Sequence, residues 1–196
     1  MSTLTLLAGA AGAHAKTVTF GIRLDHEPSN SLPAHNCRED GSDDPTPTCS
    51  RVATDSGDAV GGRLRAPADG IITKFRIRAG GPGVVTFRLA KLKNLGFDQQ
   101  LGDQSGLGRD AGVGPTVMVA GNGFAETGNP VETFPAHLRV HKGDYVGIDS
   151  TATSALYCAG SGGQLIFDQR LGHAYQQSSR SDDSCELLVQ AVMKRA

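Results

Sequence analysis

Residues 64–92 read LRAPADGIITKFRIRAGGPGVVTFRLAKL, and this stretch decides the fold class. Apolar and polar side chains alternate on both sides of the run AGGPG at 79–83, and such alternation bounded by glycine and proline predicts β-strands. We therefore expect two antiparallel strands joined at this run, each with one buried face and one solvent-exposed face. The residues expected on the buried faces are Ile71, Thr73, Phe75 and Ile77 of the first strand and Val85, Phe87 and Leu89 of the second.

The rest of the chain adds short segments of the same kind, separated by turn-forming residues, and no amphipathic helix. Many short strands with closely spaced turns are typical of a sandwich or barrel. The 196 residues exceed what a seven-stranded immunoglobulin-type domain needs. We therefore predict an all-β protein, an antiparallel β-sandwich of jelly-roll type, with about ten strands and long Gly/Pro-rich loops. Further strands are expected at 16–24, 51–54, 59–65, 117–120, 131–134, 155–158, 164–167 and 186–193, a tight hairpin at 138–148 with its turn at 141–144, and long loops at 25–50 and 94–114.

The first residues indicate export. An apolar run at 4–13 ends in Ala13-His14-Ala15, which has the small-x-small pattern of a signal-peptide cleavage site. We predict a signal peptide over residues 1–15, a single β-sandwich domain over 16–196, and hence a secreted, extracellular protein. A buried first strand is the alternative for 1–15, although Ala/Gly-rich sequence is a poor strand former. No apolar run reaches the roughly 18 residues that span a bilayer, so we expect no membrane span.

The four cysteines, Cys37, Cys49, Cys158 and Cys185, agree with an exported protein. Four cysteines allow three connectivities. We predict the pairs Cys37–Cys49 and Cys158–Cys185, because each pair would close one long loop, a constraint worth roughly 3 kcal/mol. A zinc site is the alternative, but the chain lacks the C-x-x-C and paired-His spacings of such sites.

Three stretches carry a resemblance to a known group of proteins. They are RAPADGIITKFRIR at 65–78, LRVHKGDYVGID at 138–149 and ELLVQ at 186–190. Together they resemble secreted actinobacterial proteins that share a P-x-D-G-x-I-x-x-[FW]-x-[IV] strand, a V-x-x-G-D-x-[IV]-G-[IL]-D hairpin and a closing E-L-L-x-Q/N strand. The similarity spans most of the chain after residue 15. It implies export and a β-sandwich, and it implies no active site.

An acidic loop is the first candidate site. Glu39, Asp40, Asp43 and Asp44 lie within six residues, between Cys37 and Cys49. Calcium takes six to eight oxygen ligands, and acidic loops supply them. The spacing differs from the EF-hand pattern, so a solvated charged loop is the alternative to a calcium site.

A basic stripe is the second candidate site. If the apolar positions of residues 64–92 face the core, four cations share the outer face: Lys74, Arg76, Arg78 and Arg88. Such a face suits an acidic polymer, for example a cell-wall polysaccharide. No aromatic residues interleave with these cations, and the net charge of −1 shows no overall bias, so we expect no specific nucleic acid partner. The alternative is an ordinary wet sheet face.

His173 and Tyr175 form the third candidate site, as a ligand-binding rim together with Gln176 in the polar stretch before Cys185. The alternative is a purely structural role for these residues, without a ligand. We predict no enzymatic activity. His137 and His141 have no third partner in register, and Ser161 lacks the G-x-S-x-G pattern of a nucleophile elbow.

These observations predict a secreted, non-catalytic module that binds a cell-envelope or environmental glycan. The alternative is a structural subunit of a cell-surface or extracellular assembly that self-associates by β-strand addition. No cofactor is expected apart from calcium in the acidic loop.

Overall fold

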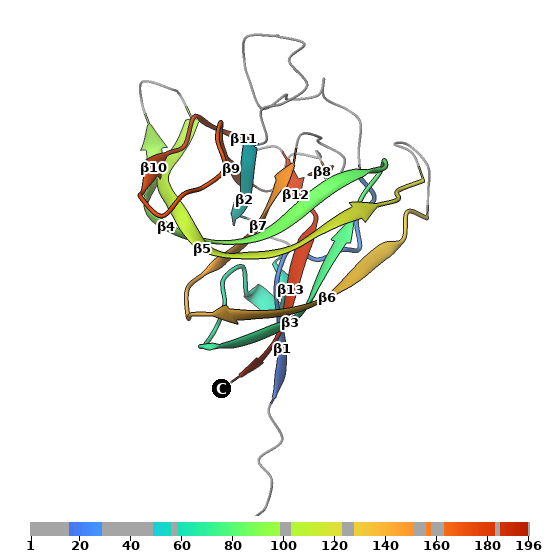
Figure 1. Ribbon diagram of the computed structural model, residues 1–196. Coiled ribbons are helices and arrows are strands. Elements are labelled where there is room, and N and C mark those ends of the chain that lie inside the picture. The colour runs from blue at the N-terminus through green and yellow to red at the C-terminus, as the bar shows by residue number, and fades with distance from the viewer. Residues whose placement is uncertain are drawn as a thin grey trace, which may run out of the picture.

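The computed structural model describes residues 16–28, 49–55, 59–98, 103–122, 128–150, 156–157, 163–182 and 185–195 (Figure 1). These residues form an all-β structure in which every ladder between named strands is antiparallel. The one helical element within these ranges is the 3-10 turn η1 (Val60–Gly62). Accordingly, this part of the chain has no helix with the length and apolar character needed to cross a membrane.

Two large sheets hold most of the strands. The first has the order β1 (Thr17–Gly21), β13 (Val189–Arg195), β3 (Gly70–Arg78) and β6 (Val131–Val140). The second has the order β10 (Gln176–Gln177), β5 (Asp103–Val119), β4 (Gly83–Asp98), β7 (Tyr145–Ser150), β2 (Cys49–Asp55), β9 (Gly163–Phe167) and β11 (Arg180–Asp182). A separate small ladder joins β12 (Glu186–Leu187) to β8 (Leu156–Tyr157).

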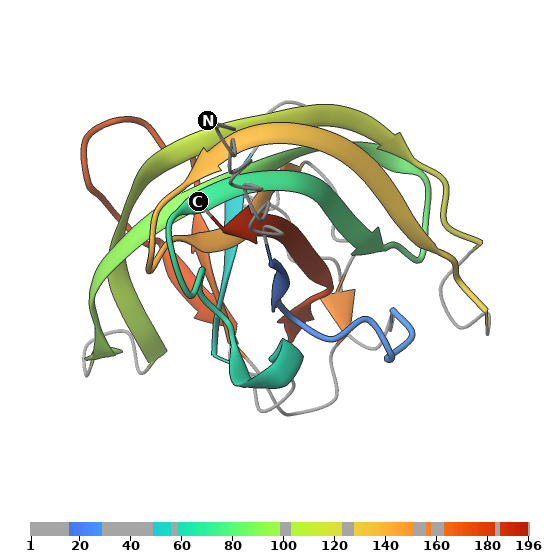
Figure 2. The ribbon, with the colours of Figure 1, turned by 90° about the horizontal axis from the view of Figure 1, so that it is seen from below.

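The two large sheets pack face to face around one hydrophobic core. Phe75 of β3 stacks on Phe87 of β4, with ring centroids 4.7 Å apart, and Phe134 of β6 packs on Phe87 at 5.8 Å. The core cluster continues through buried side chains from both sheets, such as Ile77 and Val146. Seen from below, β5 of one sheet and β6 of the other arch side by side (Figure 2). The prediction of an all-β, antiparallel fold is confirmed, and the face-to-face packing of the two sheets is sandwich-like.

The predicted pairing of the two central strands was wrong. β3 and β4 lie in different sheets, so residues 79–82 cross from one sheet to the other instead of closing a hairpin. The second strand has the predicted alternation, with Val85, Phe87 and Leu89 buried. On the first strand Phe75 and Ile77 are buried as predicted, but Ile72 fills the core in place of Ile71. Against β13, Thr73 is an extra residue, and this bulge reverses the alternation before it. The register also shifts at Thr73 against β6, where the extra residue lies in β6.

The predicted glycine-rich loop at 94–114 was also wrong for its described part, which belongs to the long strands β4 and β5. The glycines of β5 leave room for large neighbouring side chains. A Cβ at Gly114 would come 2.7 Å from the Phe75 ring, and one at Gly108 would overlap the Phe167 ring. The glycines therefore mark close packing rather than a turn. The strand predicted at 59–65 is replaced by η1 and two isolated bridges.

Two of the four cysteines are described. Cys49 and Cys185 are fully buried, neither is a free thiol, and both are disulfide-bonded. Cys37 and Cys158 lie outside the described residues, so the predicted connectivity stays a prediction. The ladder between β8 and β12 pairs Tyr157 with Glu186, and these residues are the sequence neighbours of Cys158 and Cys185.

Candidate functional site

Residues 168–179 connect β9 to β11 and cover the side of the seven-stranded sheet that faces away from the core. Leu171 anchors this segment, because it is 3% exposed and packs with Val52, Tyr145 and Phe167 in a second, smaller hydrophobic cluster. The backbone N–H of Leu171 donates to the Ser50 hydroxyl at 2.9 Å. The segment is therefore fixed to the sheet by both apolar and polar contacts.

A buried ionic network beneath this segment strengthens the attachment. The Arg88 guanidinium donates to both carboxylate oxygens of Asp149, from Nε at 2.7 Å and also from Nη2. Its Nη1 donates to Asp110 Oδ1 at 2.9 Å and to the Leu171 carbonyl at 3.0 Å. The Ser50 hydroxyl donates to Asp149 Oδ1 at 2.5 Å. Because Arg88 and Asp149 are 5% and 2% exposed, their charges compensate each other inside the protein.

A cavity of about 250 Å³ opens beside the anchored segment. One aromatic and five polar residues line it, and they are Phe167, Asp168, Gln169, Gln176, Gln177 and Ser179. We call this cavity the amide-lined pocket. Phe167 is buried, whereas Asp168, Gln169 and Gln177 are exposed. The prediction placed Gln176 in a ligand-binding rim but missed the other two glutamines, which showed no pattern in the sequence.

The amide groups of this pocket are not used by the fold. In the described part of the chain, no hydrogen bond engages the side chains of Gln169, Gln176 or Gln177, whereas the Ser179 hydroxyl donates to the Ile166 carbonyl at 3.0 Å. Each free amide offers both donors and an acceptor. The pocket therefore presents hydrogen-bonding groups on a backbone that is already held in place.

The predicted residues His173 and Tyr175 lie in the same segment. Tyr175 has 38% of its surface exposed, and His173 is exposed as well. The ammonium group of Lys93 lies 3.8 Å from the centroid of the Tyr175 ring, and the Arg109 guanidinium carbon lies 5.3 Å from it. These cation–π contacts connect the segment to β4 and β5 and fix the tyrosine ring at the surface.

The outer side of the four-stranded sheet carries a different set of groups. Lys74 and Arg76 of β3 alternate with the core residues Phe75 and Ile77, so they point away from the core. By the same argument Arg139, between Leu138 and Val140 of β6, and Lys194, after Met193 of β13, point outward too. We call Lys74, Arg76, Arg139 and Lys194 the basic face. Only Lys74 and Arg76 of this group were predicted, because the other two come from strands far away in the sequence.

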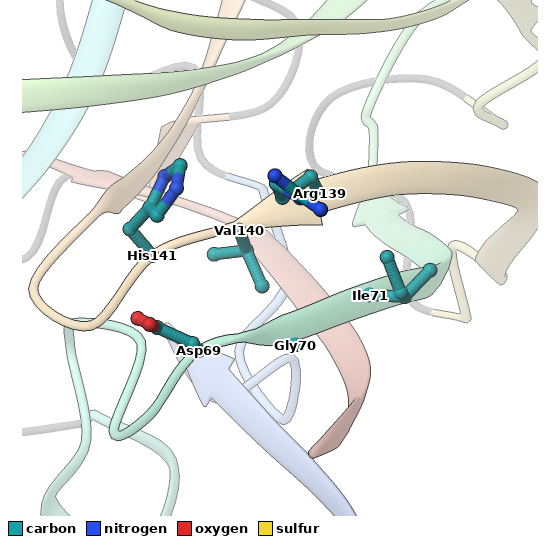
Figure 3. A pocket seen from close by; sticks show the side chains of 6 residues that line it. All are labelled: Asp69, Gly70, Ile71, Arg139, Val140 and His141. Carbon is teal, nitrogen blue, oxygen red and sulfur yellow. The ribbon is translucent and has the colours of Figure 1, made fainter. Parts of the chain in front are cut away.

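A cavity of about 350 Å³ lies at one end of the basic face, where β3 begins and β6 ends (Figure 3). Its lining residues are Asp69, Gly70, Ile71, Arg139, Val140 and His141. The Asp69 carboxylate accepts a hydrogen bond from the Lys142 backbone N–H at 2.7 Å, which holds Asp69 at the cavity wall. The cavity thus combines a cation, an anion, an imidazole and apolar surface.

The turn beside this cavity depends on Asp144. Its Oδ2 accepts a hydrogen bond from the His141 backbone N–H at 2.8 Å and lies 3.7 Å from His141 Nδ1. Burial raises the pKa of the Asp144 carboxyl above its ordinary value, although the His141 N–H and the charge of Lys91 act in the opposite direction. Asp144 therefore has a structural part in the turn that leads from β6 to β7.

The predicted basic stripe was wrong for Arg88, and the donors of a second member, Arg78, are used within the fold. Arg88 lies on the other sheet and is buried, because residues 79–82 carry the chain across the sandwich. Arg78 is on the predicted face, but its guanidinium bonds to Glu27 at 2.6 Å and to three backbone carbonyl groups, those of Leu24, His26 and Asn129. Its donors are therefore occupied in holding the segment after β1 and the segment before β6 against the end of β3.

The predicted calcium ligands Glu39, Asp40, Asp43 and Asp44 lie outside the described residues. Within the described ranges, no group of three or more His, Cys, Asp or Glu side chains is arranged to hold a metal ion. The calcium site stays a prediction.

The chain matches no protein-family model, no curated protein and no solved structure at a significant level. The resemblance to secreted actinobacterial proteins therefore stays a prediction, and the function has to be argued from the sites themselves.

Proposed function

We propose that this protein is a secreted, non-catalytic module that binds a glycan through the amide-lined pocket. The observation that carries the proposal is the set of unengaged amides, Gln169, Gln176 and Gln177, around one cavity. Sugar hydroxyl groups donate and accept hydrogen bonds at once, and an amide can serve both roles. The Asp168 carboxylate adds acceptor oxygens for the same kind of partner.

The attachment of the segment supports a binding role. A ligand that meets groups already held in position loses less binding free energy to the ordering of side chains and backbone. The Arg88–Asp149 network and the burial of Leu171 supply this order before any ligand arrives. The exposed ring of Tyr175 adds a surface against which a sugar ring can pack.

We further propose that the sandwich is a jelly roll. A jelly roll can be described as one long antiparallel hairpin that is rolled into two sheets, which pairs the first strand with the last and each inner strand with its counterpart. The ladders β1–β13, β2–β7, β3–β6 and β4–β5 are nested in this way. Lectin domains are among the jelly rolls, which is a fold-level analogy and adds only modestly to the glycan proposal.

The alternative function, assembly by strand addition, has less support from the described strands. β6 lies at one edge of the four-stranded sheet and carries Pro135, which has no N–H to donate to an added strand. The edge strands of the other sheet, β10 and β11, have two and three residues. Short edges and an edge proline are features that limit strand addition.

The proposal is tested by applying the purified protein to an array of neutral glycans and measuring the affinity of the best ligand by calorimetry. We expect the double substitution Gln176→Ala/Gln177→Ala to weaken that affinity at least tenfold, since two good hydrogen bonds are worth about 1–3 kcal/mol together. Thr133→Ala/His137→Ala, two polar truncations on the exposed side of β6, should leave it unchanged. Absence of any glycan ligand, or equal loss in both double variants, would contradict the proposal.

A further inference from the structure

We infer that the basic face and its cavity form a second binding site, for a polysaccharide that carries carboxylate groups. This site is on the opposite sheet from the amide-lined pocket, so the inference is independent of the proposed function. It rests on three observations: the uncompensated charge of the face, the spacing of its cations, and the mixed chemistry of the cavity.

The charge of the face has no acidic partner among the described residues. Among the described residues no acidic side chain forms an ion pair with Lys74, Arg139 or Lys194, and all three are exposed. Arg76 is half-buried and donates to a neutral group, the Gln190 side-chain oxygen, at 3.0 Å. Four cations thus share one sheet face where the fold itself makes little use of their charge. Such a face attracts polyanions from solution.

The cations are spread along a line rather than clustered at a point. Arg139 and Lys194 flank Ile71 on either side in the sheet, because Ile71 pairs with both of them. Two strand spacings separate them, which is about 10 Å. Lys74 and Arg76 continue along β3, two residues and therefore roughly 7 Å apart. An extended chain with charges at repeated intervals fits this arrangement better than one small anion does.

The cavity at the end of the line favours a sugar acid over other anions. The Arg139 guanidinium can bind a carboxylate through two parallel hydrogen bonds. Asp69, on the same cavity wall, repels a second anionic group but accepts hydrogen bonds from hydroxyls. Ile71 and Val140 supply apolar surface for the C–H side of a sugar ring. A unit with one carboxylate and several hydroxyls satisfies all of these groups together (Figure 3).

Two other polyanionic partners fit less well. Single-stranded nucleic acids are bound by stacking of bases on aromatic side chains, and the exposed large hydrophobic residues of the described chain include none from the four-stranded sheet. The same observation disfavours an anionic lipid surface, because the face offers no large apolar side chain to insert among the acyl chains.

The experiment measures binding of the purified protein to polygalacturonate at several salt concentrations. We expect binding that weakens as salt rises, because the contacts are between exposed charges. Lys194→Glu and Arg139→Glu should each weaken it about tenfold or more. Lys93→Glu makes the same change of charge on β4 of the other sheet and should leave the affinity within twofold. Lys74→Glu gives a second test on β3 if either of the first two variants fails to fold.

Four comparison ligands decide the chemical class: dextran, polyglutamate, duplex DNA and vesicles with anionic lipid. Dextran, a neutral polysaccharide, and polyglutamate, which has carboxylates without sugars, should both bind at least tenfold more weakly than polygalacturonate. Equal or tighter binding of polyglutamate, duplex DNA or vesicles with anionic lipid would overturn the assignment to a polysaccharide. No binding of polygalacturonate, or binding that the charge reversals leave intact, would overturn the site. The variant Gln176→Ala/Gln177→Ala should bind polygalacturonate normally, which separates this result from the test of the amide-lined pocket.

Discussion

Arg88 illustrates how a single residue connects the sheet to the segment that carries the amide-lined pocket. Its guanidinium donates four hydrogen bonds, three to the carboxylates of Asp110 and Asp149 and one to the backbone carbonyl of Leu171. Truncation of such a residue leaves two acidic side chains with little exposure, and the exposed Arg170, 4.0 Å from Asp149, is the one cation still paired with them among the described residues. Breaking a buried ion pair in this way costs about 3–5 kcal/mol.

We therefore expect Arg88→Ala to lower the free energy of unfolding by about 3–5 kcal/mol, measured by urea denaturation. The matched control is Arg76→Ala on β3. Arg76 is half-buried and bonds to a neutral glutamine, so its truncation should cost about 1 kcal/mol. Equal losses in the two variants would show that the Arg88 network does not stabilise the fold in the way described.

The pKa of Glu27 is shifted in the opposite direction from that of Asp144. Burial acts to raise the pKa of the Glu27 carboxyl, but hydrogen bonds from Gly128 and Asn129 and the charge of Arg78 outweigh burial and hold that pKa below its ordinary value. A carboxyl whose pKa is lowered by folding stabilises the folded state above its unfolded pKa, about 4.3 for glutamate. That contribution is lost as the pH falls through the folded pKa.

Glu27→Gln should therefore be less stable than the parent protein at neutral pH, and the difference should narrow as the pH falls below about 4.3. The measurement is the melting temperature of both proteins between pH 7 and pH 3. Asp25→Asn, at a neighbouring carboxylate that is 59% exposed, provides the control. A gap that stays constant across this range would contradict the assigned direction of the pKa shift.

At the scale of elements, close contact between strands determines which glycines can be replaced. Gly70 begins β3, beside β13, and a Cβ there would overlap the Lys194 carbonyl oxygen and come 2.7 Å from the Met193 side chain. Gly96 lies in β4 and has no heavy atom within 4 Å of the same position. Neither glycine has a positive φ, so the two differ in packing alone.

Gly70→Ala should lower the free energy of unfolding by about 1–3 kcal/mol, because β3 and β13 have to move apart. Gly96→Ala should change it by less than about 0.5 kcal/mol. Urea denaturation of both variants tests this comparison. If Gly70→Ala is as stable as Gly96→Ala, then β13 does not lie against β3 as described.

At the scale of the whole molecule, the ladders bear on the pairing of the cysteines. Cys49 lies at the start of β2 and Cys185 directly before β12, and both are disulfide-bonded. Because Glu186 pairs with Tyr157, the chain next to Cys185 is held beside the chain next to Cys158. This ladder agrees with the predicted pair Cys158–Cys185, and both predicted pairs stay predictions.

We expect mass spectrometry of an unreduced digest to find the peptides of Cys158 and Cys185 linked, and those of Cys37 and Cys49 linked. Reduction should destabilise the protein by about 3 kcal/mol for each long loop that is opened. Detection of a Cys49–Cys185 or Cys49–Cys158 peptide would reject the predicted connectivity.

The sequence by itself determined which faces of the strands are buried wherever alternation is regular, as at Val85, Phe87 and Leu89. Local chemistry suffices there, because a strand exposes alternate side chains whatever it pairs with. Alternation failed at Ile71 and Ile72, since the bulge at Thr73 arises from the register with the neighbouring strand β13. The glycines of β5 led to the wrong prediction of a loop for a similar reason. The aromatic rings that occupy the space above them belong to other strands.

Only the tertiary structure decided which strands share a sheet, and with it the composition of both candidate sites. Arg88 is not part of the basic face, because β3 and β4 belong to opposite sheets. Arg139 and Lys194 lie on the same face as Lys74, because their strands, distant in the sequence, pair with β3. Gln169 and Gln176 line one pocket because buried Leu171 fixes the segment between them to the sheet. Sequence patterns report the environment of a residue along its own strand, whereas a binding site depends on pairings across strands that no local pattern contains.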